Sequence, residues 1–412
     1  MEDKKNIVNI YIEQMIDNFY NNKYKREQYI DILFFGVEML KNNIVRDFLK
    51  KEITEIIKRI LMDIKVNTIE YPFVFQDGIA NGKVELAFAI RSLHEYQGGL
   101  DKLLNSVEEE LVNSLYNKLD YMYTNMMRFS FYDVISGLSS GMYYLLNSSN
   151  LLLRKDIYFK IEKLLHFLID CTKDYRYENC ILIKFHVQCD YQVTNIEKEI
   201  MKNGHINLGM AHGILGPLIT LVKAYELEIR LEGQKEAILK LYNIYKRFET
   251  KKKGILVYSR RVSIENYIKG KISDITENFG WCYGNISVVR GLMKTTRILG
   301  LDYEYRMYQE EMVILVNQPY INYNFTSPIV CHGYASIVTM QLIMYLETGD
   351  IRYISTLERN VTLMIKEHKR LLESNFEYSN NLSLLSGSGG VIMTILASIS
   401  FDFNYHKILL ID

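Results

Sequence analysis

The stretch Trp281-Cys282-Tyr283-Gly284 precedes an apolar run that ends at Met293, and Cys331-His332-Gly333 precedes a second apolar run that ends at Leu346. Each stretch places a cysteine in a glycine-containing turn directly before a helix-length segment. Two thiols and one imidazole are ligands that zinc prefers, and three protein ligands leave one position open for chemistry. Because 49 positions separate Cys282 from Cys331, the fold has to bring the two turns together.

Six segments repeat the pattern of a glycine turn followed by an apolar run. The intervals between their anchoring glycines are 55, 76, 71, 49 and 54 residues, for Gly82, Gly137, Gly213, Gly284, Gly333 and Gly387. An interval of about 50 residues accommodates two helices and their connections. The sequence therefore predicts a repeat architecture in which each unit is a helical hairpin.

The two helices of each predicted hairpin differ in their apolar pattern. Residues 334–346 are apolar nearly all round, which is typical of a helix buried on every side. Residues 357–371 carry an apolar stripe between Lys and Glu residues, and residues 157–168 repeat that stripe. One helix of each hairpin is thus expected inside and the other outside. We predict an all-α fold, an α/α toroid of six helical-hairpin repeats that form a double ring.

The two long intervals indicate insertions into this toroid. Residues 1–70 show helical periodicity without a glycine turn and are interpreted as an N-terminal helical lead-in, and residues 71–412 as the toroid. The insertions are expected near 174–206 and 246–275, where Ile181–Gln188 and Ile255–Ser263 have the β-branched and aromatic character of strands. The basic run Lys246–Lys253 is expected to be a solvated loop, with binding of an acidic peptide segment as the alternative.

Composition restricts the class of protein. The 412 residues are 48% hydrophobic and 24% charged, with a formal net charge of zero, so nucleic acid is not an expected partner. No secretory signal and no apolar run of about 18 residues is found. An odd number of cysteines without an export signal favours reduced thiols and a cytoplasmic location. Cys171, Cys180 and Cys189 lie outside the turns and are expected to be structural.

The unusual polar residues of the repeats all lie in glycine turns, and equivalent turns of a ring share one face. They are Asp133, His212, Cys282, Cys331 and His332. Each has an alternative explanation: a buried small hydrophobe for either cysteine, a helix N-cap for Asp133, and a core side chain for His212. Trp281 and Tyr283 could likewise be packing aromatics. Their joint occurrence at equivalent repeat positions favours a common site.

Four of these turns resemble those of lanthionine synthetase C-like proteins, the cyclases that close thioether rings in lantibiotic precursor peptides. The matching stretches are Trp281–Gly284, Cys331–Gly333, Ala211–Gly213 and Asp133–Gly137, and the resemblance extends from about residue 75 to the end. It implies a stand-alone class I enzyme. It also implies that Cys282, Cys331 and His332 bind Zn²⁺, and that His212, Asp133 and Tyr283 serve acid–base steps.

The resemblance further implies a reaction and its partners. Cysteine thiolates of a dehydrated precursor peptide, which carries a leader, would add to dehydroalanine or dehydrobutyrine. A dehydratase and an ABC exporter are expected partners, and they would hold the enzyme at the inner face of the cell membrane. The chain departs from the family at Asn278, where members often have arginine, and at Ile286-Ser287, where Pro-Gly is usual.

Other classes of protein account for the residues less well. A toroid glycosidase needs two carboxylates that flank the sugar. In the other glycine turns, Asp77 is the one carboxylate that could pair with Asp133. A zinc prenyltransferase shares thiolate activation but usually needs a second subunit and a carboxylate ligand. A non-catalytic, peptide-binding toroid with structural zinc would normally have four protein ligands, and the sequence offers three. Another thiol-alkylating zinc enzyme remains an alternative.

Overall fold

The computed structural model describes residues 2–66, 77–272 and 278–412. The chain forms two compact units: a first unit of Met1–Glu108 and Val316–Asp412, and a second unit of Glu109–Leu315. The predicted boundary at residues 70 and 71, and the predicted end of the second insertion near 275, lie outside the described residues. The separation of a lead-in from a toroid domain therefore stays a prediction.

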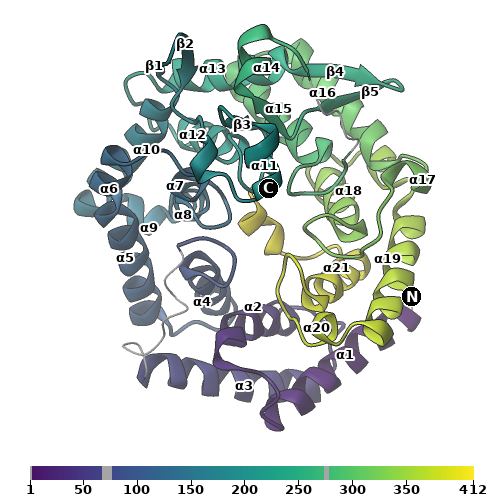
Figure 1. Ribbon diagram of the computed structural model, residues 1–412. Coiled ribbons are helices and arrows are strands. Elements are labelled where there is room, and N and C mark those ends of the chain that lie inside the picture. The colour runs from purple at the N-terminus through teal and green to yellow at the C-terminus, as the bar shows by residue number, and fades with distance from the viewer. Residues whose placement is uncertain (1, 67–76, 273–277) are drawn as a thin grey trace. The chain divides into compact units, whose positions relative to one another are not determined.

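The longer helices of the second unit are α8, α10, α12, α13 and α15. Their bounds are Leu138–Leu146, Lys155–Cys171, Leu215–Glu226, Gln234–Arg247 and Asn285–Leu299. The helix α12 packs against α8 on one side and α15 on the other, and α10 and α13 pack against this row (Figure 1). Every residue of α8 is buried, whereas α10 buries only a stripe that includes Ile157, Ile161 and Leu168. The predicted contrast between the two helices of a hairpin is confirmed here.

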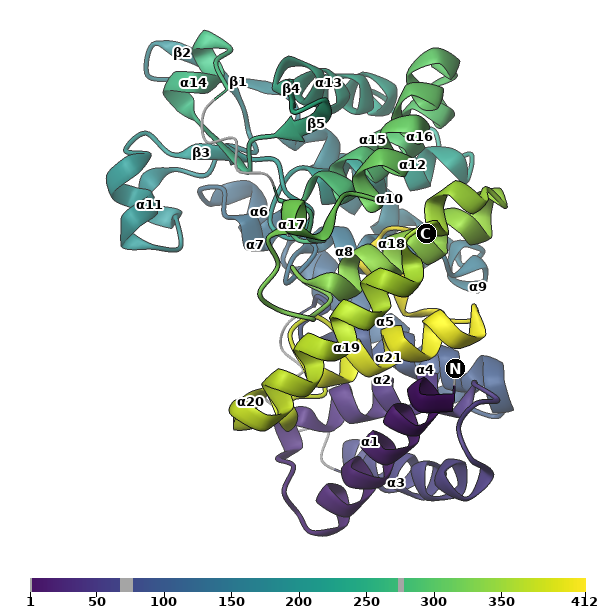
Figure 2. The same cartoon turned by 90° about the vertical axis from the view of Figure 1, so that its right-hand side faces the viewer.

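The insertions and their edges form three separate two-stranded antiparallel sheets in the second unit. The predicted segment Ile255–Ser263 contains two strands, whereas Ile181–Gln188 is a strand only as far as Ile183. The strands are β1 (Asp174–Tyr177), β2 (Cys180–Ile183), β3 (His205–Asn207), β4 (Glu249–Lys252), β5 (Ile255–Tyr258) and β6 (Arg261–Ser263). The register pairs Asp174 with Ile183, Asn207 with Arg261 and Glu249 with Tyr258. The β3–β6 sheet joins the two insertions. Figure 2 shows β1, β2, β3 and the short helices α11 (Asn195–Ile200) and α14 (Ile264–Lys269) on one side of this unit.

The basic run Lys246–Lys253 is not the loop that the sequence suggested. Lys246 and Arg247 end α13, and Glu249–Lys252 form β4. Lys246 forms an ion pair with Glu249 at 2.6 Å. The strand β4 pairs with β5 along its whole length. The loop prediction failed because strand pairing overrides the high charge of the segment.

The first unit contains both ends of the chain. Its longer helices are α1 (Glu2–Tyr20), α2 (Tyr29–Leu40), α3 (Asp47–Val66), α4 (Lys83–Gln97), α18 (Tyr334–Thr348), α19 (Leu357–Ser374) and α21 (Ser388–Ser400). Helix α21 packs against α1, α2, α18 and α19, and the Tyr11 hydroxyl lies 2.5 Å from the Ser388 hydroxyl. Helix α2 is buried from Ile30 to Leu40. It therefore resembles the six predicted buried helices, although no glycine turn precedes it.

The remaining helices connect these elements. They are α5 (Asp101–Asn117), α6 (Leu119–Thr124), α7 (Phe129–Tyr132), α9 (Ser149–Leu152), α16 (Asp302–Val316), α17 (Tyr320–Tyr323) and α20 (Phe376–Ser379). The chain passes from one unit to the other within α5 and within α16. Among the described helices, none combines the length and the apolar character that crossing a membrane requires.

The six predicted glycine turns all lie where the sequence placed them. Gly82, Gly137, Gly284, Gly333 and Gly387 are the N-cap residues of α4, α8, α15, α18 and α21, and Gly213 directly precedes the N-cap of α12. At Gly137 the reason for glycine is close approach: a Cβ there would lie 2.9 Å from Oδ1 of Asp133. The turn that carries Asp133 thus has no room for a side chain at this position.

Candidate active site

Backbone hydrogen bonds join three of the glycine turns in the second unit. The Val134 N–H donates to the Ala211 carbonyl at 3.1 Å, and the N–H groups of Met210 and Ala211 donate to the Cys282 carbonyl at 2.9 and 3.0 Å. These bonds pair the turn before α8 with the turn before α12, and that turn with the one before α15. As a result, the structure brings Asp133, His212 and Tyr283 to one place.

Asp133 and His212 form a hydrogen-bonded pair. Asp133 Oδ2 lies 2.6 Å from His212 Nδ1, and the Asp133 side chain is fully buried while the His212 side chain is 31% exposed. The other carboxylate oxygen accepts from the Ser136 N–H at 2.9 Å. Burial raises the pKa of Asp133, and the hydrogen bond from His212 acts in the opposite direction. With Nδ1 engaged, Nε2 is the imidazole nitrogen left for a substrate.

Tyr283 lies beside this pair. Its ring centroid is 6.4 Å from that of His212. The phenol oxygen is 3.4 Å from the Asn207 amide nitrogen and 3.3 Å from an Arg261 guanidinium nitrogen, and the guanidinium carbon lies 5.2 Å from the ring centroid. Burial raises the pKa of Tyr283, and the charge of Arg261 opposes that rise. Gly209 leaves space for the ring, because a Cβ there would collide with it.

A cavity of about 220 Å³ opens onto His212 and Tyr283. Its other lining residues come from α7, from the insertions and from their strands: Phe129, Gln192, Val193, Thr194, Glu197, His205, Asn207 and Arg261. Burial lowers the pKa of His205 to about 3, so that side chain is neutral near neutral pH. His205, Asn207, Glu197 and Arg261 were not predicted as site residues, because no repeat pattern marks them in the sequence.

The thiols of Cys282 and Cys331 and the imidazole of His332 form a group of candidate metal ligands, with one ligand atom from each lying within 4.8 Å of the others. Ligand atoms on a tetrahedral zinc are roughly 3.5–3.8 Å apart, and such separations fall within this limit. Two soft thiolates and one imidazole suit zinc, and they leave a fourth position open. The residues present therefore fit a zinc ion.

The other cysteines make local contacts. All five cysteines are free of disulfides. The Cys180 thiol donates to the Tyr177 carbonyl at 2.9 Å, the Cys189 thiol lies 3.6 Å from the Lys198 carbonyl, and Cys171 is buried. None of these three belongs to the candidate metal group found among the described residues. The structural role expected for these three cysteines stays a prediction.

Asn278 supports the turn that carries Cys282. Its side-chain oxygen accepts from the Gly280 N–H at 2.9 Å, and its carbonyl accepts from the Asn285 N–H at 2.8 Å. Both bonds hold the chain just before α15. The amide is neutral and engaged within the turn, so at this position the chain provides a structural group and no charge.

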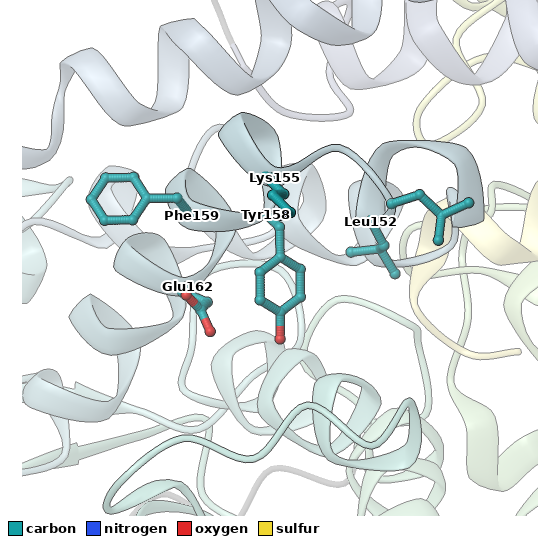
Figure 3. Close-up of a pocket in the computed structure, with 6 residues that line it drawn as sticks. Leu152, Lys155, Tyr158, Phe159 and Glu162 are labelled. Carbon is teal, nitrogen blue, oxygen red and sulfur yellow. The ribbon is translucent and has the colours of Figure 1, made fainter.

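Figure 3 shows a second cavity, of about 280 Å³, at the surface of α9 and α10. It is lined by Leu152, Leu153, Lys155, Tyr158, Phe159 and Glu162. Leu153 and Phe159 are exposed aliphatic and aromatic side chains. The lining contains none of the residues that the sequence predicted for a site.

Comparisons with known proteins agree with the resemblance noted in the sequence. The model of the family described as lanthionine synthetase C-like protein matches residues 34–410. The nisin biosynthesis protein NisC of Lactococcus lactis subsp. lactis is 26% identical over 341 residues, which cover 81% of this chain and 77% of NisC. The solved structure of a nisin cyclase is 20% identical with a TM-score of 0.81, and the match covers 97% of this chain and 96% of that one. This likeness confirms the predicted all-α toroid fold.

Proposed function

The chain belongs to the lanthionine synthetase C-like family, and we propose from that premise that it is a lantibiotic cyclase. Its substrate would be a precursor peptide in which serine and threonine residues have been dehydrated. Cysteine thiols of the peptide would add to dehydroalanine or dehydrobutyrine and close lanthionine or methyllanthionine rings. NisC and nisin cyclase, by their names, belong to nisin production, and their similarity to this chain supports the assignment.

The donor set of Cys282, Cys331 and His332 is the observation that carries the proposal. We infer that these residues hold Zn²⁺, since two thiols and an imidazole favour it over harder cations. Three protein ligands are typical of a catalytic zinc, whereas structural sites normally have four. When bound, zinc supplies Lewis acidity that lowers the pKa of a substrate thiol toward neutral pH.

The carbon chemistry would fall to the residues of the cavity. The substrate thiolate adds to the β-carbon of the dehydro residue, a C–S bond forms, and the alkene electron pair moves to the carbonyl oxygen as an enolate. The α-carbon then takes a proton, for which protonated His212 is the proposed donor through Nε2. Asp133, buried and bonded to Nδ1 at 2.6 Å, would orient the imidazole so that Nε2 is the nitrogen available to the substrate.

The proposed activity is tested with dehydrated nisin precursor, a probe chosen because NisC is similar over most of this chain. Ring closure does not change mass, so free thiols are alkylated with N-ethylmaleimide and the adducts are counted by mass spectrometry. We expect fewer adducts on the peptide after incubation with the protein, one fewer for each ring formed. A protein that binds the peptide and leaves every thiol free would instead be a non-catalytic peptide-binding toroid. Alkylation of the thiols by another group would indicate a different thiol-alkylating zinc enzyme.

Zinc is tested independently of activity. Metal analysis of the purified protein should give close to one zinc per chain, and Cys282→Ala should lose most of it. Cys180→Ala is the matched control, because the Cys180 thiol bonds to a backbone carbonyl and should not affect zinc content. Equal zinc loss in the two variants would contradict the ligand assignment.

The proposed reaction also implies partners. The alkenes have to be made before rings can close, so a dehydratase must act first on the same peptide. We propose that the dehydratase and an ABC exporter associate with this cyclase, which would then work in the cytoplasm at the inner face of the membrane. Co-purification of the tagged protein with a dehydratase, dependent on the precursor peptide, is the expected result.

A further inference from the structure

Arg261 is the cationic side chain of the cavity that holds His212 and Tyr283. Among the residues that the structure describes, no other lysine or arginine lines that cavity, and the low pKa of His205 keeps that neighbour neutral. Arg261 is the first residue of β6, and its pairing with Asn207 of β3 fixes the position of its Cα atom. Its guanidinium also forms an ion pair with Glu197 at 2.9 Å, and the two side chains are 26% and 12% exposed. The charge is thus held in a half-buried place.

The phenol oxygen of Tyr283 receives two donors from this sheet. Asn207 of β3 and Arg261 of β6 each approach it, at 3.4 and 3.3 Å. A phenol oxygen that accepts two hydrogen bonds directs its own O–H to a third partner. Within the described part of the chain, no residue is seen to accept that proton. Because Tyr283 lines the cavity, a substrate carbonyl is a suitable acceptor.

The proposed reaction requires such a donor. When the thiolate adds to the β-carbon, the electron pair displaced from the alkene moves to the carbonyl oxygen, and the negative charge stays there until the α-carbon takes its proton. A donor aimed at that oxygen is most effective in a site with little water, where its dipole and any nearby positive charge act with little screening.

We propose that Arg261 is a positioning residue for this reaction: it holds Tyr283 so that the phenol donates to the enolate oxygen, and its positive charge strengthens that donation. The inference rests on the proposed cyclase function. It gives the β3–β6 sheet, which joins the two insertions, a part in the chemistry. Removal of the guanidinium should therefore lower kcat more than it raises KM, since the charge acts mainly on the transition state.

The test uses the full chain with its zinc and dehydrated nisin precursor. Arg261→Ala is expected to lower kcat by about 10–10², the scale for a residue that orients another and less than the roughly 10²–10³ lost with the donor itself, while zinc content stays unchanged. Arg261→Lys should recover part of the rate, since it restores a charge but not the planar fork. Arg297→Ala is the matched control, because Arg297 also pairs with a glutamate, Glu226 at 3.0 Å, and does not line the cavity.

Chemical rescue separates charge from packing. Millimolar guanidinium chloride should restore part of the Arg261→Ala rate, whereas urea at the same concentration, which has a similar shape without the charge, should not. Equal rescue by both, or a kcat for Arg261→Ala equal to that of the unchanged protein, would overturn the role of Arg261. Absence of ring closure by the unchanged, zinc-loaded protein would instead reject the proposed function and the inference with it.

Discussion

The hydrogen bond between Asp133 and His212 determines which imidazole nitrogen can act on a substrate. Asp133 is fully buried and accepts from His212 and from the Ser136 N–H. Such a carboxylate fixes the orientation of the ring and leaves Nε2 as the nitrogen that can exchange a proton with a substrate. The same pair would also suit a general base toward the substrate thiol, so geometry by itself permits two roles for His212.

Replacement of His212 by asparagine distinguishes the two roles. If His212 donates the proton to the α-carbon, His212→Asn should retain zinc and bind peptide but close rings about 10²–10⁴ more slowly, at every pH from 6 to 9. If His212 deprotonates the thiol, higher pH should restore the rate, since hydroxide then removes that proton. The rate of ring closure, measured as the fall in the number of thiols that can be alkylated, distinguishes the two roles across this pH range. Full recovery of this rate at pH 9 would reject the role of His212 as the acid that protonates carbon.

Outside the site, packing between helices in the first unit makes His368 a contributor to the pH dependence of stability. His368 of α19 is buried, and its Nδ1 lies 2.6 Å from the Tyr378 hydroxyl of α20. The ring of Tyr11, from α1, has its centroid 6.2 Å away. Burial lowers the pKa of His368 to about 4, with the charge of Lys369 acting in the same direction. The imidazole is therefore neutral in the folded chain near neutral pH.

A histidine with a lowered pKa destabilises the fold as the pH falls. Its pKa is about 6.5 in the unfolded chain, so between pH 6.5 and 4 the unfolded state binds a proton that the folded state does not. This difference should reduce the free energy of unfolding by about 2 kcal/mol from pH 7 to pH 5. In His368→Gln that part of the dependence should vanish, as measured by urea denaturation at both pH values. An unchanged dependence in the variant would show that His368 titrates normally.

The elements also show how far sequence reasoning reaches. A glycine turn before an apolar helix is a local signal, so α8, α15 and α18 were predicted with the turns that carry Asp133, Cys282 and Cys331. The pairing of β3 with β6 is not local, because its register depends on two insertions that meet only in the fold. Arg261 and Asn207 lie on those strands, and no periodicity in the sequence distinguishes them from other polar residues of the insertions. Helix α2 was not predicted among the buried helices, because it lacks the glycine turn that served as the local signal.

The contacts of α1 bear on whether the whole chain unfolds in one cooperative transition. Helix α1 packs against α21 and α3, so the start of the chain contacts its end within the first unit. The chain continues into the second unit within α5, whose residues divide between the two units, whereas only the last residue of α16, Val316, belongs to the first unit. An uninterrupted helix transmits loss of structure from one part to the next, because its hydrogen bonds form cooperatively. We therefore expect the two units to unfold together.

Two isoleucines of α1 test this cooperativity. Ile12 is fully buried and Ile10 is 52% exposed, so Ile12→Ala should cost about 2–5 kcal/mol and Ile10→Ala less than about 0.5 kcal/mol. The chain has one tryptophan, Trp281, which lies buried in the second unit, and its fluorescence reports on the turn before α15. In urea, Ile12→Ala should move the Trp281 transition and the circular dichroism transition by the same amount. If the Trp281 midpoint stays in place while part of the circular dichroism signal is lost earlier, α1 and its neighbours fold independently, as the lead-in interpretation of residues 1–70 would require.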